Sequence, residues 1–477
     1  MKTFLTIAAA GNHPQPSSTT APRSATATAT LRLTVQADCR LEGASQPLLN
    51  ALYQELTIDN PKYQAAHKYG RWVGKNLPRR LYFYELHDDV LRFPRGFAKQ
   101  AVRLCRQFMG RGPQVIDQRR LLPAAAFDFQ GELRPYQQLA LNELLQSSFG
   151  VLEAGTGSGK TVMALAAIAA RQQPTLILLH SKELMYQWQE RIKTFLGLTA
   201  GLIGDGLCQL GPISVAIVNT ARKHLDDLPR HFGQLIVDEC HRVPASLFTD
   251  VVTAFDAQYT LGLSATAYRR EDGLTKLIYY YLGERTARVE AKALEAAGMV
   301  LKPCFIQRPT AFNYGFRGDY AALMTALTQD DARNRQIAAD IAAESGQGAG
   351  TVLVVSDRVA HCETLAERLL GQGIAVTVLT GRVPARNRQE IVEAVRRGSI
   401  KVLISTLQLI GEGFDCPGLT TLFLTTPIKF SGRLLQVVGR ILRPAAGKEA
   451  KVYDYIDPVG VLQASARTRL LTYQQED

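Results

Sequence analysis

The hydrophobic positions of this chain fall into two series of short apolar runs that alternate with amphipathic, helix-like stretches. The first series follows Leu133, and the second begins near Thr351. Uninterrupted apolar runs between helices are typical of parallel strands that are covered on both faces. The expected strands are residues 151–154, 175–180, 214–220, 234–239 and 259–266, then 351–357, 375–380, 401–406, 420–426 and 451–456. The pattern predicts an α/β fold with two tandem parallel-sheet lobes.

A different pattern precedes the first lobe. Residues 1–30 are rich in Ser, Thr, Ala and Pro, which favours a disordered tail. For residues 31–125 we expect a small α+β N-terminal domain that begins with an alternating strand. Its other expected elements are a helix over 46–56, a hairpin formed by 81–86 and 90–94, and a basic amphipathic helix over 97–109.

The rest of the chain divides into the two lobes and a tail. We expect the first lobe over residues 126–290, the second over 291–465 and a C-terminal tail over 466–477. About 85 residues separate the last strand of the first lobe from the first strand of the second. Because that span exceeds an ordinary loop, we expect it to hold helices or a small insertion within 285–345.

The N-terminal domain interleaves basic and aromatic residues, and this pattern has two interpretations. In one, the aromatic rings stack on bases while the cations contact phosphates. In the other, the rings are ordinary core residues and the cations are solvated. The sequence favours neither. The residues are Arg71, Lys75, Arg79, Arg80, Arg92, Arg95, Lys99, Arg103 and Arg106, with Trp72, Tyr82, Phe83, Tyr84 and Phe93.

The composition narrows the class of protein. The net charge of +12 indicates a polyanionic partner, for which nucleic acid is the first candidate, although an inert basic surface gives the same number. The seven cysteines are scattered without a C-x-x-C pair, which argues against a zinc ribbon and fits buried free thiols in a reducing cytoplasm. No apolar run approaches the ~18 residues of a membrane span, so we expect a cytoplasmic protein.

A glycine-rich loop follows the first expected strand and opens a helix. It comprises Ala154, Gly155, Thr156, Gly157, Ser158, Gly159, Lys160 and Thr161. Backbone N–H groups of such a loop cradle phosphate oxygens at the positive end of a helix. Lys160 would reach the β and γ phosphates of ATP, and the Thr161 hydroxyl would bind Mg²⁺. Glycine is usual where Ala154 stands, and alanine is tolerated there if its backbone stays out of the left-handed region.

Two acidic residues complete the expected ATP site. Asp238 and Glu239 end an apolar strand, and 77 residues lie between Lys160 and Asp238. The carboxyl edge of a parallel sheet is where ligands bind in open α/β folds. We expect Asp238 to hold Mg²⁺ and Glu239 to orient and deprotonate the attacking water.

Two arginines of the second lobe are candidate arginine fingers. Arg440 and Arg443 are three residues apart, so they share one face of a helix end. They would meet the γ-phosphate across a cleft between the lobes and stabilise the transition state. Considered alone, they are more simply surface arginines.

The ordered motifs resemble those of superfamily 2 DEAD/DEAH-like helicases, whose lobes are RecA-like. The resemblance covers about residues 133–457. It implies adenine recognition by Arg134 and Gln137, contact with the nucleic-acid backbone near Ser181 and Lys182, and coupling by Ser264, Ala265 and Thr266. Residues 352–357 resemble motif IV, Gly413 and Asp415 belong to a motif V-like segment that contributes to the ATP site, and Gln436 belongs to the motif VI-like segment with the two arginines.

A finer resemblance is to XPB-like DNA helicases and phage UvsW-type translocases. Arg270, Glu271 and Asp272 stand where that group has an Arg-Glu-Asp element implicated in duplex opening, although an ordinary charged loop gives the same residues. The group also carries a DNA-sensing domain before the first lobe and a thumb-like insertion near the second. In the acidic motif, Cys240 replaces the usual Ala, and His241 would link the ATP site to Ser264–Thr266.

The resemblance implies a nucleic-acid-stimulated ATPase that acts as a DNA helicase or translocase in repair, recombination or phage DNA metabolism. Thr220 and Thr406 would add sequence-independent backbone contacts. The alternatives are a non-unwinding duplex translocase of a restriction complex, which would need a nuclease partner, an RNA helicase, and a scaffold with a vestigial site. We expect a monomer that acts on DNA, with a nuclease or repair protein as the class of partner, and no membrane association.

Overall fold

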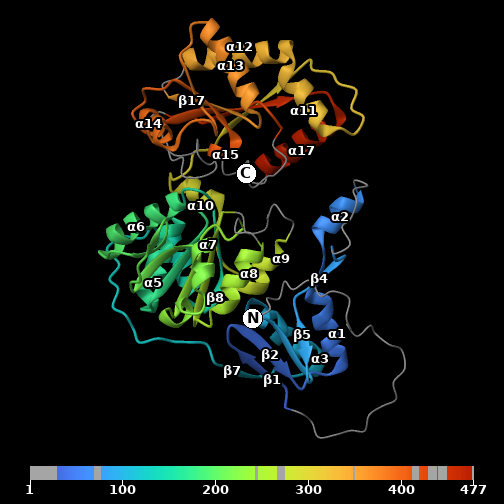
Figure 1. Cartoon of the computed structure of the whole chain (residues 1–477), viewed down its shortest axis with the longest axis vertical. Helices are drawn as coiled ribbons and strands as arrows, with labels where there is room; N and C mark the ends of the chain where they lie inside the picture. Colours follow the sequence, from blue (N-terminus) through green and yellow to red (C-terminus); the bar gives the residue numbers. More distant parts are fainter. Residues whose placement is uncertain are drawn as a thin grey trace. The chain divides into compact units, whose positions relative to one another are not determined.

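A computed structural model of the chain describes residues 30–68, 77–241, 245–265, 274–347, 350–410, 418–427, 438 and 448–474. The chain forms two compact units. The first comprises Met1–Ala154 and Lys160–Arg288, and the second comprises Gly155–Gly159 and Val289–Asp477. Figure 1 shows the first unit from blue to yellow-green and the second from yellow to red. The predicted fold class is confirmed: each lobe is built on a parallel sheet, and a small α+β region precedes the first lobe.

The α+β region of the first unit is a five-stranded sheet with two helices packed together. The strand order is β5-β6-β2-β1-β7, in which only β1 and β7 are parallel neighbours. Helices α1 and α3 pack against each other. The elements are β1 (Arg32–Val35), β2 (Asp38–Glu42), α1 (Gln46–Glu55), β5 (Glu85–His87), β6 (Val90–Pro94), η1 (Arg95–Phe97), α3 (Ala98–Met109) and β7 (Gln114–Asp117), with β3 (Thr57–Asp59), α2 (Pro61–Lys68) and β4 (Arg80–Tyr82) beside them.

The hairpin expected from residues 81–86 and 90–94 is shorter than predicted. The first run is split into β4, which pairs with β3 in a separate two-stranded sheet, and β5, which pairs with β6. Asp88 and Asp89 turn the chain between β5 and β6 with φ values of 48° and 64°. Two consecutive left-handed residues are the conformation of a tight two-residue hairpin turn, for which Asp is well suited.

The lobe of the first unit is an eight-stranded sheet in the order β11-β10-β12-β9-β13-β14-β8-β15. From β10 to β8 each neighbouring pair is parallel. Its strands are β8 (Phe149–Ala154), β9 (Thr175–Leu179), β10 (Gly201–Gly204), β11 (Leu207–Cys208), β12 (Ile213–Ile217), β13 (Gln234–Val237), β14 (Tyr259–Ser264) and β15 (Arg285–Val289). Its helices are α4 (Pro135–Leu145), α5 (Lys160–Arg171), α6 (Lys182–Leu196), α7 (Val218–Ala221), α8 (Ala245–Ala254) and α9 (Lys276–Leu282). The strand expected over 214–220 ends at Ile217, so Thr220 lies on α7.

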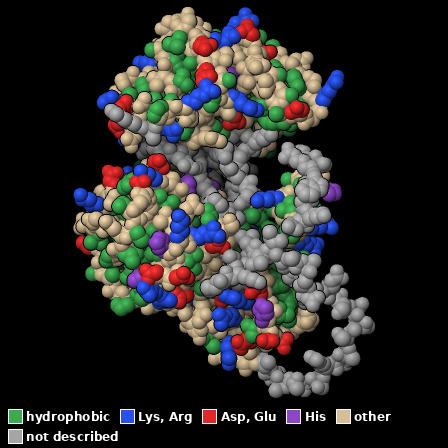
Figure 2. All heavy atoms as spheres, viewed as in Figure 1, with side chains coloured by type: hydrophobic (Ala, Val, Ile, Leu, Met, Phe, Trp, Pro, Cys, Tyr) green, Lys and Arg blue, Asp and Glu red, His purple; other side chains and the backbone are tan. Residues whose placement is uncertain are grey.

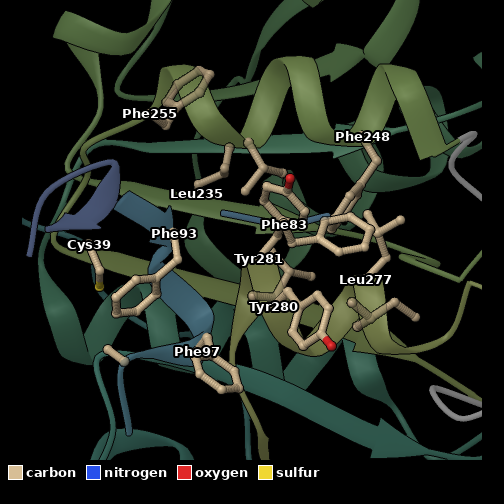
Figure 3. Packing of buried hydrophobic residues seen from close by; sticks show 14 of the residues in the cluster. Cys39, Phe83, Phe93, Phe97, Leu235, Phe248, Phe255, Leu277, Tyr280 and Tyr281 are labelled. Carbon is tan, nitrogen blue, oxygen red and sulfur yellow. The ribbon is translucent and has the colours of Figure 1, made fainter. Parts of the chain in front are cut away.

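The N-terminal region and this lobe share one hydrophobic core. Figure 3 shows Phe83, Phe93 and Phe97 packed among lobe residues that include Tyr280 and Tyr281 of α9. Arg95 is 2% exposed and donates to the Ala257 carbonyl at 2.9 Å and the Thr260 hydroxyl at 2.5 Å. An ideal Cβ at Gly96 would lie 2.4 Å from the Gly283 nitrogen, so only glycine fits at this contact. The two regions therefore pack as one body.

This core decides part of the question about the basic and aromatic residues. Phe83 and Phe93 are fully buried, which makes them core residues rather than surfaces for base stacking. Arg95 is buried, and Arg92 pairs with Asp38. Arg79, Arg80, Lys99, Arg103 and Arg106 remain exposed, as does Tyr82, while Tyr84 is half-buried; Arg71, Trp72 and Lys75 lie outside the described residues.

The second unit is a six-stranded sheet whose neighbouring strands are all parallel, in the order β16-β21-β20-β17-β19-β18. Its strands are β16 (Cys304–Pro309), β17 (Thr351–Ser356), β18 (Val376–Leu379), β19 (Val402–Thr406), β20 (Leu419–Leu424) and β21 (Lys451–Ile456). Its helices are α10 (Ala291–Ala296), α11 (Tyr320–Gln329), α12 (Asp331–Gln347), α13 (Val359–Gly371), α14 (Ala385–Arg396), α15 (Leu407–Ile410) and α17 (Gly460–Gln474).

Residues 285–345 hold helices, which is one of the two alternatives expected for this span. In the part that the structure describes, β15, α10, β16, α11 and most of α12 fill it, and β16 joins the sheet of the lobe. The expected tail over 466–477 is instead largely helical, because α17 continues to Gln474. The Arg469 guanidinium anchors that helix through buried bonds of 2.8–3.1 Å to the Asp454 carboxylate.

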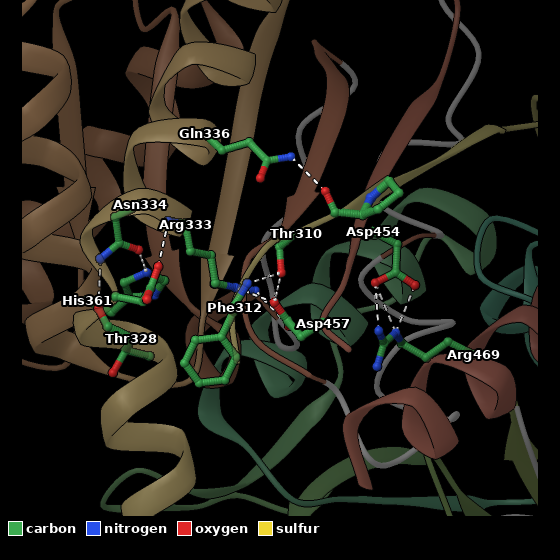
Figure 4. A network of polar contacts seen from close by, with 12 residues as sticks. Thr310, Phe312, Thr328, Arg333, Asn334, Gln336, His361, Asp454, Asp457 and Arg469 are labelled. Atoms are coloured by element: carbon green, nitrogen blue, oxygen red, sulfur yellow. Dashed lines mark hydrogen bonds and ion pairs between the residues drawn. The ribbon is translucent and has the colours of Figure 1, made fainter. Parts of the chain in front are cut away.

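A buried polar network ties α12 and α13 to the strand ends of the second unit, as Figure 4 shows. The Arg333 guanidinium donates to both oxygens of Asp457, at 2.8 and 3.3 Å. His361 lies 2.9 Å from the Ser356 hydroxyl and 2.9 Å from the Asn334 carboxamide oxygen. Burial, with a smaller effect of the Arg333 charge, lowers the pKa of His361 to about 3, so its ring is neutral near pH 7.

The surface bears on three further expectations. On the face in Figure 2, basic and acidic side chains are interspersed over the described parts of both units. Cys39, Cys105, Cys240 and Cys362 are buried free thiols as expected, but Cys208 and Cys304 are exposed. Among the described residues, no helix has the length and apolar character that a membrane crossing requires.

Candidate active site

Four neighbouring strands of the first unit bring the predicted motifs to one edge of the sheet. Strands β9, β13, β14 and β8 are adjacent and parallel, so their carboxyl ends meet. The glycine-rich loop follows β8, and Asp238 with Glu239 follows β13. Ser264 ends β14, and Ser181 opens α6 after β9. Residues up to 110 positions apart in sequence therefore converge by topology.

The glycine-rich loop has the backbone conformation that a phosphate cradle requires. Gly157 and Gly159 adopt φ values of 86° and 80°, where a side chain would be strained. The Lys160 ammonium donates to the Ala154 carbonyl at 2.9 Å, across the base of the loop. Ala154 is buried at the end of β8 and is not left-handed, which satisfies the condition for an alanine there. Thr161 is half-buried in the first turn of α5, and Ser158 is buried.

Asp238 is a buried carboxylate held by two N–H donors. Its Oδ1 accepts from the Glu239 backbone at 2.9 Å, and its Oδ2 accepts from the Trp188 indole at 2.8 Å. Burial first, and then the charge of Glu239, raise the pKa of Asp238 to about 6; the Trp188 bond and the Lys160 charge oppose that rise. Within the described residues, no Lys, Arg or His nitrogen lies within 4.0 Å of this carboxylate.

Glu239 and His241 connect the acidic motif to the end of β14. Glu239 has a φ of 44°, an uncommon value for a residue with a side chain. The His241 Nδ1 atom lies 3.3 Å from the Glu239 carboxylate and 2.9 Å from the Ser264 hydroxyl. Cys240, between them, is fully buried and bonds through its backbone to Leu263. The geometry brings His241 and Ser264 together, and Ala265 follows directly in the chain.

The helix that precedes the loop positions the two residues expected at the adenine. Arg134 is the N-cap of α4, and its backbone N–H donates to the Gln137 carboxamide oxygen at 3.0 Å. Gln137 is 6% exposed. A glutamine at the third helical position that bonds back to the cap residue fixes the first turn of the helix.

The residues expected to contact nucleic acid lie at strand and helix ends. The Ser181 hydroxyl caps α6 by accepting from the Leu184 N–H at 3.4 Å. Lys182 is exposed and pairs with Asp205 at 2.6 Å, and Tyr186 donates to the same carboxylate at 2.8 Å. Thr220 is half-buried on α7. Thr406, in the second unit, is half-buried at the end of β19.

Several predicted site residues lie outside the described residues. They are Thr266, Arg270, Glu271 and Asp272 after β14, and Gly413, Asp415, Gln436, Arg440 and Arg443 in the second unit. Their roles stay predictions.

Two residues that touch the site were not singled out from the sequence. They are Trp188, which bonds to Asp238, and Asp205, which pairs with Lys182. The signal for Trp188 was present, because Met185, Trp188, Ile192 and Leu196 follow helical spacing and form the buried face of α6. No comparable pattern marks Asp205, which lies in the turn between β10 and β11 with a φ of 53°.

The donor set suits a magnesium ion. Carboxylate and hydroxyl oxygens are the protein ligands that Mg²⁺ prefers, and it binds through one or two carboxylates plus substrate phosphates. Asp238, which follows β13, would supply the carboxylate, and Thr161, in the first turn of α5, would supply the hydroxyl. The Lys160 charge lowers the pKa of Asp238, which favours the ionised carboxylate that a metal needs. The residues present therefore fit the ion.

Comparisons with known proteins cover both lobes. Residues 130–269 match the family model described as "Type III restriction enzyme, res subunit". Residues 335–445 match the model of the helicase conserved C-terminal domain. The first match contains the glycine-rich loop, the acidic motif and Ser264, and the second contains Arg440 and Arg443.

Individual relatives agree with these models. A protein named helicase D10 of Escherichia phage T5 is 27% identical over 365 residues, covering 74% of this chain and 78% of that protein. A protein named as a Rad25 DNA 3'-5' helicase from Halobacterium salinarum is 30% identical over 385 residues, covering 76% of this chain. The chain spans only 62% of that second relative's length.

A solved structure supports the fold alone. It is a fragment described as an HsdR subunit of a type I restriction enzyme from Vibrio vulnificus, with a TM-score of 0.56 and 18% identity over 72% of this chain and 66% of that chain. The two family models match in order on the two parallel-sheet lobes, and relatives named as helicases match over 74–76% of this chain. The chain therefore belongs to the superfamily 2 helicases, which are ATP-dependent enzymes.

Proposed function

We propose that this chain hydrolyses ATP at the sheet edge of its first lobe and uses the hydrolysis to move along DNA. The observation that carries the proposal is the state of Asp238: a carboxylate that is 7% exposed, beside the glycine-rich loop, held by N–H donors and without an ion-pair partner among the described residues. A buried charge is costly unless it is paired or binds a metal. Asp238 would hold a Mg²⁺ ion that accompanies ATP, and the ion would supply the compensating positive charge.

The site residues then have separate tasks. The backbone of Gly155–Gly159 cradles the phosphates, and Lys160 exchanges its bond to the Ala154 carbonyl for phosphate oxygens. Asp238 and Thr161 hold Mg²⁺, which stabilises charge that develops on the phosphates when it is bound. Glu239 orients and deprotonates the water. Arg134 and Gln137 are expected at the adenine.

The other predicted residues complete the proposal. His241 and Ser264, in contact at 2.9 Å, would carry the state of Glu239 to the segment after β14, where Arg270, Glu271 and Asp272 stand in the sequence. Arg440 and Arg443 would stabilise charge on the γ-phosphate.

DNA is the proposed track. Ser181, Lys182, Thr220 and Thr406 are the candidate contacts to the backbone. Lys182 now pairs with Asp205, so a DNA phosphate must replace that carboxylate, and binding should weaken steeply with salt. The relative from Halobacterium salinarum is named for DNA and for 3'-5' polarity, which is the polarity to test first. The exposed Lys99, Arg103 and Arg106 lie on one face of α3 and are a further candidate DNA surface.

The proposed setting is a reducing cytoplasm, in which the six described cysteines stay free, and a role in repair, recombination or phage DNA metabolism. We propose that the chain acts as a monomer. A nuclease or repair protein is the class of partner that fits such a role.

The test is steady-state ATP turnover with and without nucleic acid. Wild-type protein should turn over slowly alone and at least about tenfold faster with DNA. Lys160→Ala should be inactive in both conditions. Lys193→Ala is the matched control, because Lys193 is an exposed lysine in the last turn of α6, and it should behave as wild type. Unstimulated turnover, or an active Lys160→Ala variant, contradicts the proposal.

A second candidate is a duplex translocase that moves without separating strands. It is favoured by the first family model, described as a restriction enzyme subunit. A forked substrate tests strand separation, and displacement of a triplex-forming strand from duplex DNA tests translocation. Triplex displacement without unwinding would select this candidate, and stimulation by RNA alone would select the RNA helicase alternative.

A further inference from the structure

Trp188 is buried in the first lobe with its polar atom directed at the acidic motif. It lies on α6 and is 2% exposed. Its indole N–H donates to the Asp238 Oδ2 atom at 2.8 Å, which is a good hydrogen-bond distance. An indole N–H needs a partner when it is buried, and here the partner is the carboxylate expected to hold Mg²⁺.

This bond completes a fixed setting for the carboxylate. The other oxygen of Asp238 accepts from the Glu239 backbone at 2.9 Å, so each oxygen has one donor. Both donors are rigid, because one is main chain and the other is an indole in the packed face that α6 presents with Met185, Ile192 and Leu196. The plane of the carboxylate is therefore set before any metal arrives. Residues around the ligands of a metal act in this way, by orienting the ligand.

The same helix begins at the segment expected to contact DNA. Ser181 caps α6, and Lys182 is its first residue. Trp188 lies seven positions after Ser181, which is about 10 Å along a helix at 1.5 Å per residue. One rigid element therefore carries a candidate DNA contact at one end and holds the Mg²⁺ ligand two turns later.

We propose that Trp188 is a positioning residue that sets the Asp238 carboxylate for Mg²⁺ through its indole N–H, which places the metal site under the control of α6. The inference rests on the proposed function, since it takes Asp238 as the metal ligand. This positioning role differs from a packing role, because a residue that only packs needs the ring of Trp188, whereas positioning of the carboxylate also needs the indole N–H.

The experiment measures the affinity of a fluorescent ADP analogue in Mg²⁺ and in EDTA, for the full chain. The variant is Trp188→Phe, which keeps an aromatic ring but removes the N–H. We expect its affinity in EDTA to equal that of wild type, while the gain from Mg²⁺ falls about tenfold, as other changes beside metal ligands do. The matched control is Tyr186→Phe, which removes a hydroxyl from the same helix, α6, where it bonds to Asp205. This variant should keep the full gain in affinity from Mg²⁺.

The outcomes separate this inference from the proposed function. A wild-type gain from Mg²⁺ that Trp188→Phe retains overturns the positioning role and leaves the proposed function standing. A wild type without any gain overturns both.

A second readout serves if Trp188→Phe does not fold. The chain has two tryptophans, so Trp72→Phe leaves Trp188 as the only one. In that protein, addition of Mg²⁺ to the ADP-bound state should change the Trp188 emission, and an unchanged emission would count against the inference.

Discussion

Each unit buries a carboxylate just beyond a strand of its sheet, and the two carboxylates are treated in opposite ways. Asp457 follows β21 in the second unit, and its side chain is 1% exposed. It receives two bonds from the Arg333 guanidinium and one of 2.6 Å from the Thr310 hydroxyl. Asp238 follows β13 in the first unit, and its hydrogen bonds within the described residues come from two N–H groups, the Trp188 indole and the Glu239 backbone.

The difference indicates what each carboxylate is for. Asp457 is neutralised by the protein itself, so it fixes α12 against the strand ends and has no charge left for a ligand. Asp238 has no such cation beside it among the described residues, and burial raises its pKa. A buried carboxylate with a raised pKa that lies among motif residues is a candidate for function.

The largest expected effect follows from removal of the Asp238 charge. Asp238→Asn should lower ATP turnover by roughly 100-fold or more, because a metal stabilises the transition state by several kcal/mol. Its folded-state pKa lies above the unfolded value, so the charged carboxylate weakens the folded protein above about pH 6. The melting temperature of Asp238→Asn at pH 7.5 should therefore equal or exceed that of wild type, and a large drop would remove the contrast with Asp457.

The reverse pattern is expected for the second unit. Asp457→Asn should cost about 3–5 kcal/mol of stability, because it leaves the buried Arg333 charge uncompensated. Urea unfolding followed by fluorescence would measure it. The double variant Arg333→Met with Asp457→Leu should recover much of the loss, since it removes both charges. A stable Asp457→Asn variant would show that the ion pair is not structural.

A smaller effect concerns pH. The pKa of His361 is lowered from 6.5 to about 3, so the unfolded chain binds a proton between these values while the folded chain does not. Stability contributed by neutral His361 is thus complete above about pH 6.5 and is lost as the pH falls toward 3. The free energy of unfolding should therefore change through His361 by at most ~1.4 kcal/mol per pH unit. His361→Gln should flatten the slope of the urea midpoint between pH 7 and 5, whereas replacement of the exposed His87 by Gln should not.

The smallest effect is expected at an exposed ion pair. Arg382 and Glu363 lie 2.7 Å apart, but their side chains are 74% and 43% exposed. Such pairs contribute about 0–1 kcal/mol. Arg382→Met should therefore leave the urea midpoint nearly unchanged. A loss of stability comparable to that of Asp457→Asn would mean that the ion pair itself, rather than its burial, determines how much stability is lost when it is broken.

The sequence predicted those strands whose signal lies within a few consecutive residues, and it missed strands that depend on tertiary pairing. The central strands were predicted because a parallel strand covered on both faces is buried along its whole length and has a nearly continuous apolar run, as β9 and β17 do. The short, glycine-containing β10 and the half-exposed edge strand β16 lack that signal and were missed. The 81–86 run looked continuous, but its two halves pair with different strands, which only tertiary structure determines.

The same distinction applies to the site. The glycine-rich loop is a local motif, and all of its residues were identified from the sequence. Asp238 and Glu239 were identified in the same way, because they end an apolar strand. Trp188 reaches Asp238 across 50 residues, and nothing in the sequence spacing of these two residues links them. The pairing of Lys182 with Asp205 has the same origin, since it depends on how β10 and β11 place their turn beside α6.

The role of Asp238 can be measured through the Mg²⁺ dependence of nucleotide binding in wild type and Asp238→Asn. Calorimetric titration with ADP in Mg²⁺ and in EDTA should give a gain in affinity of at least about tenfold for wild type, because Asp238 would hold an ion that favours the bound phosphates. Asp238→Asn should bind in EDTA as wild type does and show almost no gain. An equal gain in both proteins would contradict the claim that Asp238 is kept unpaired for the metal.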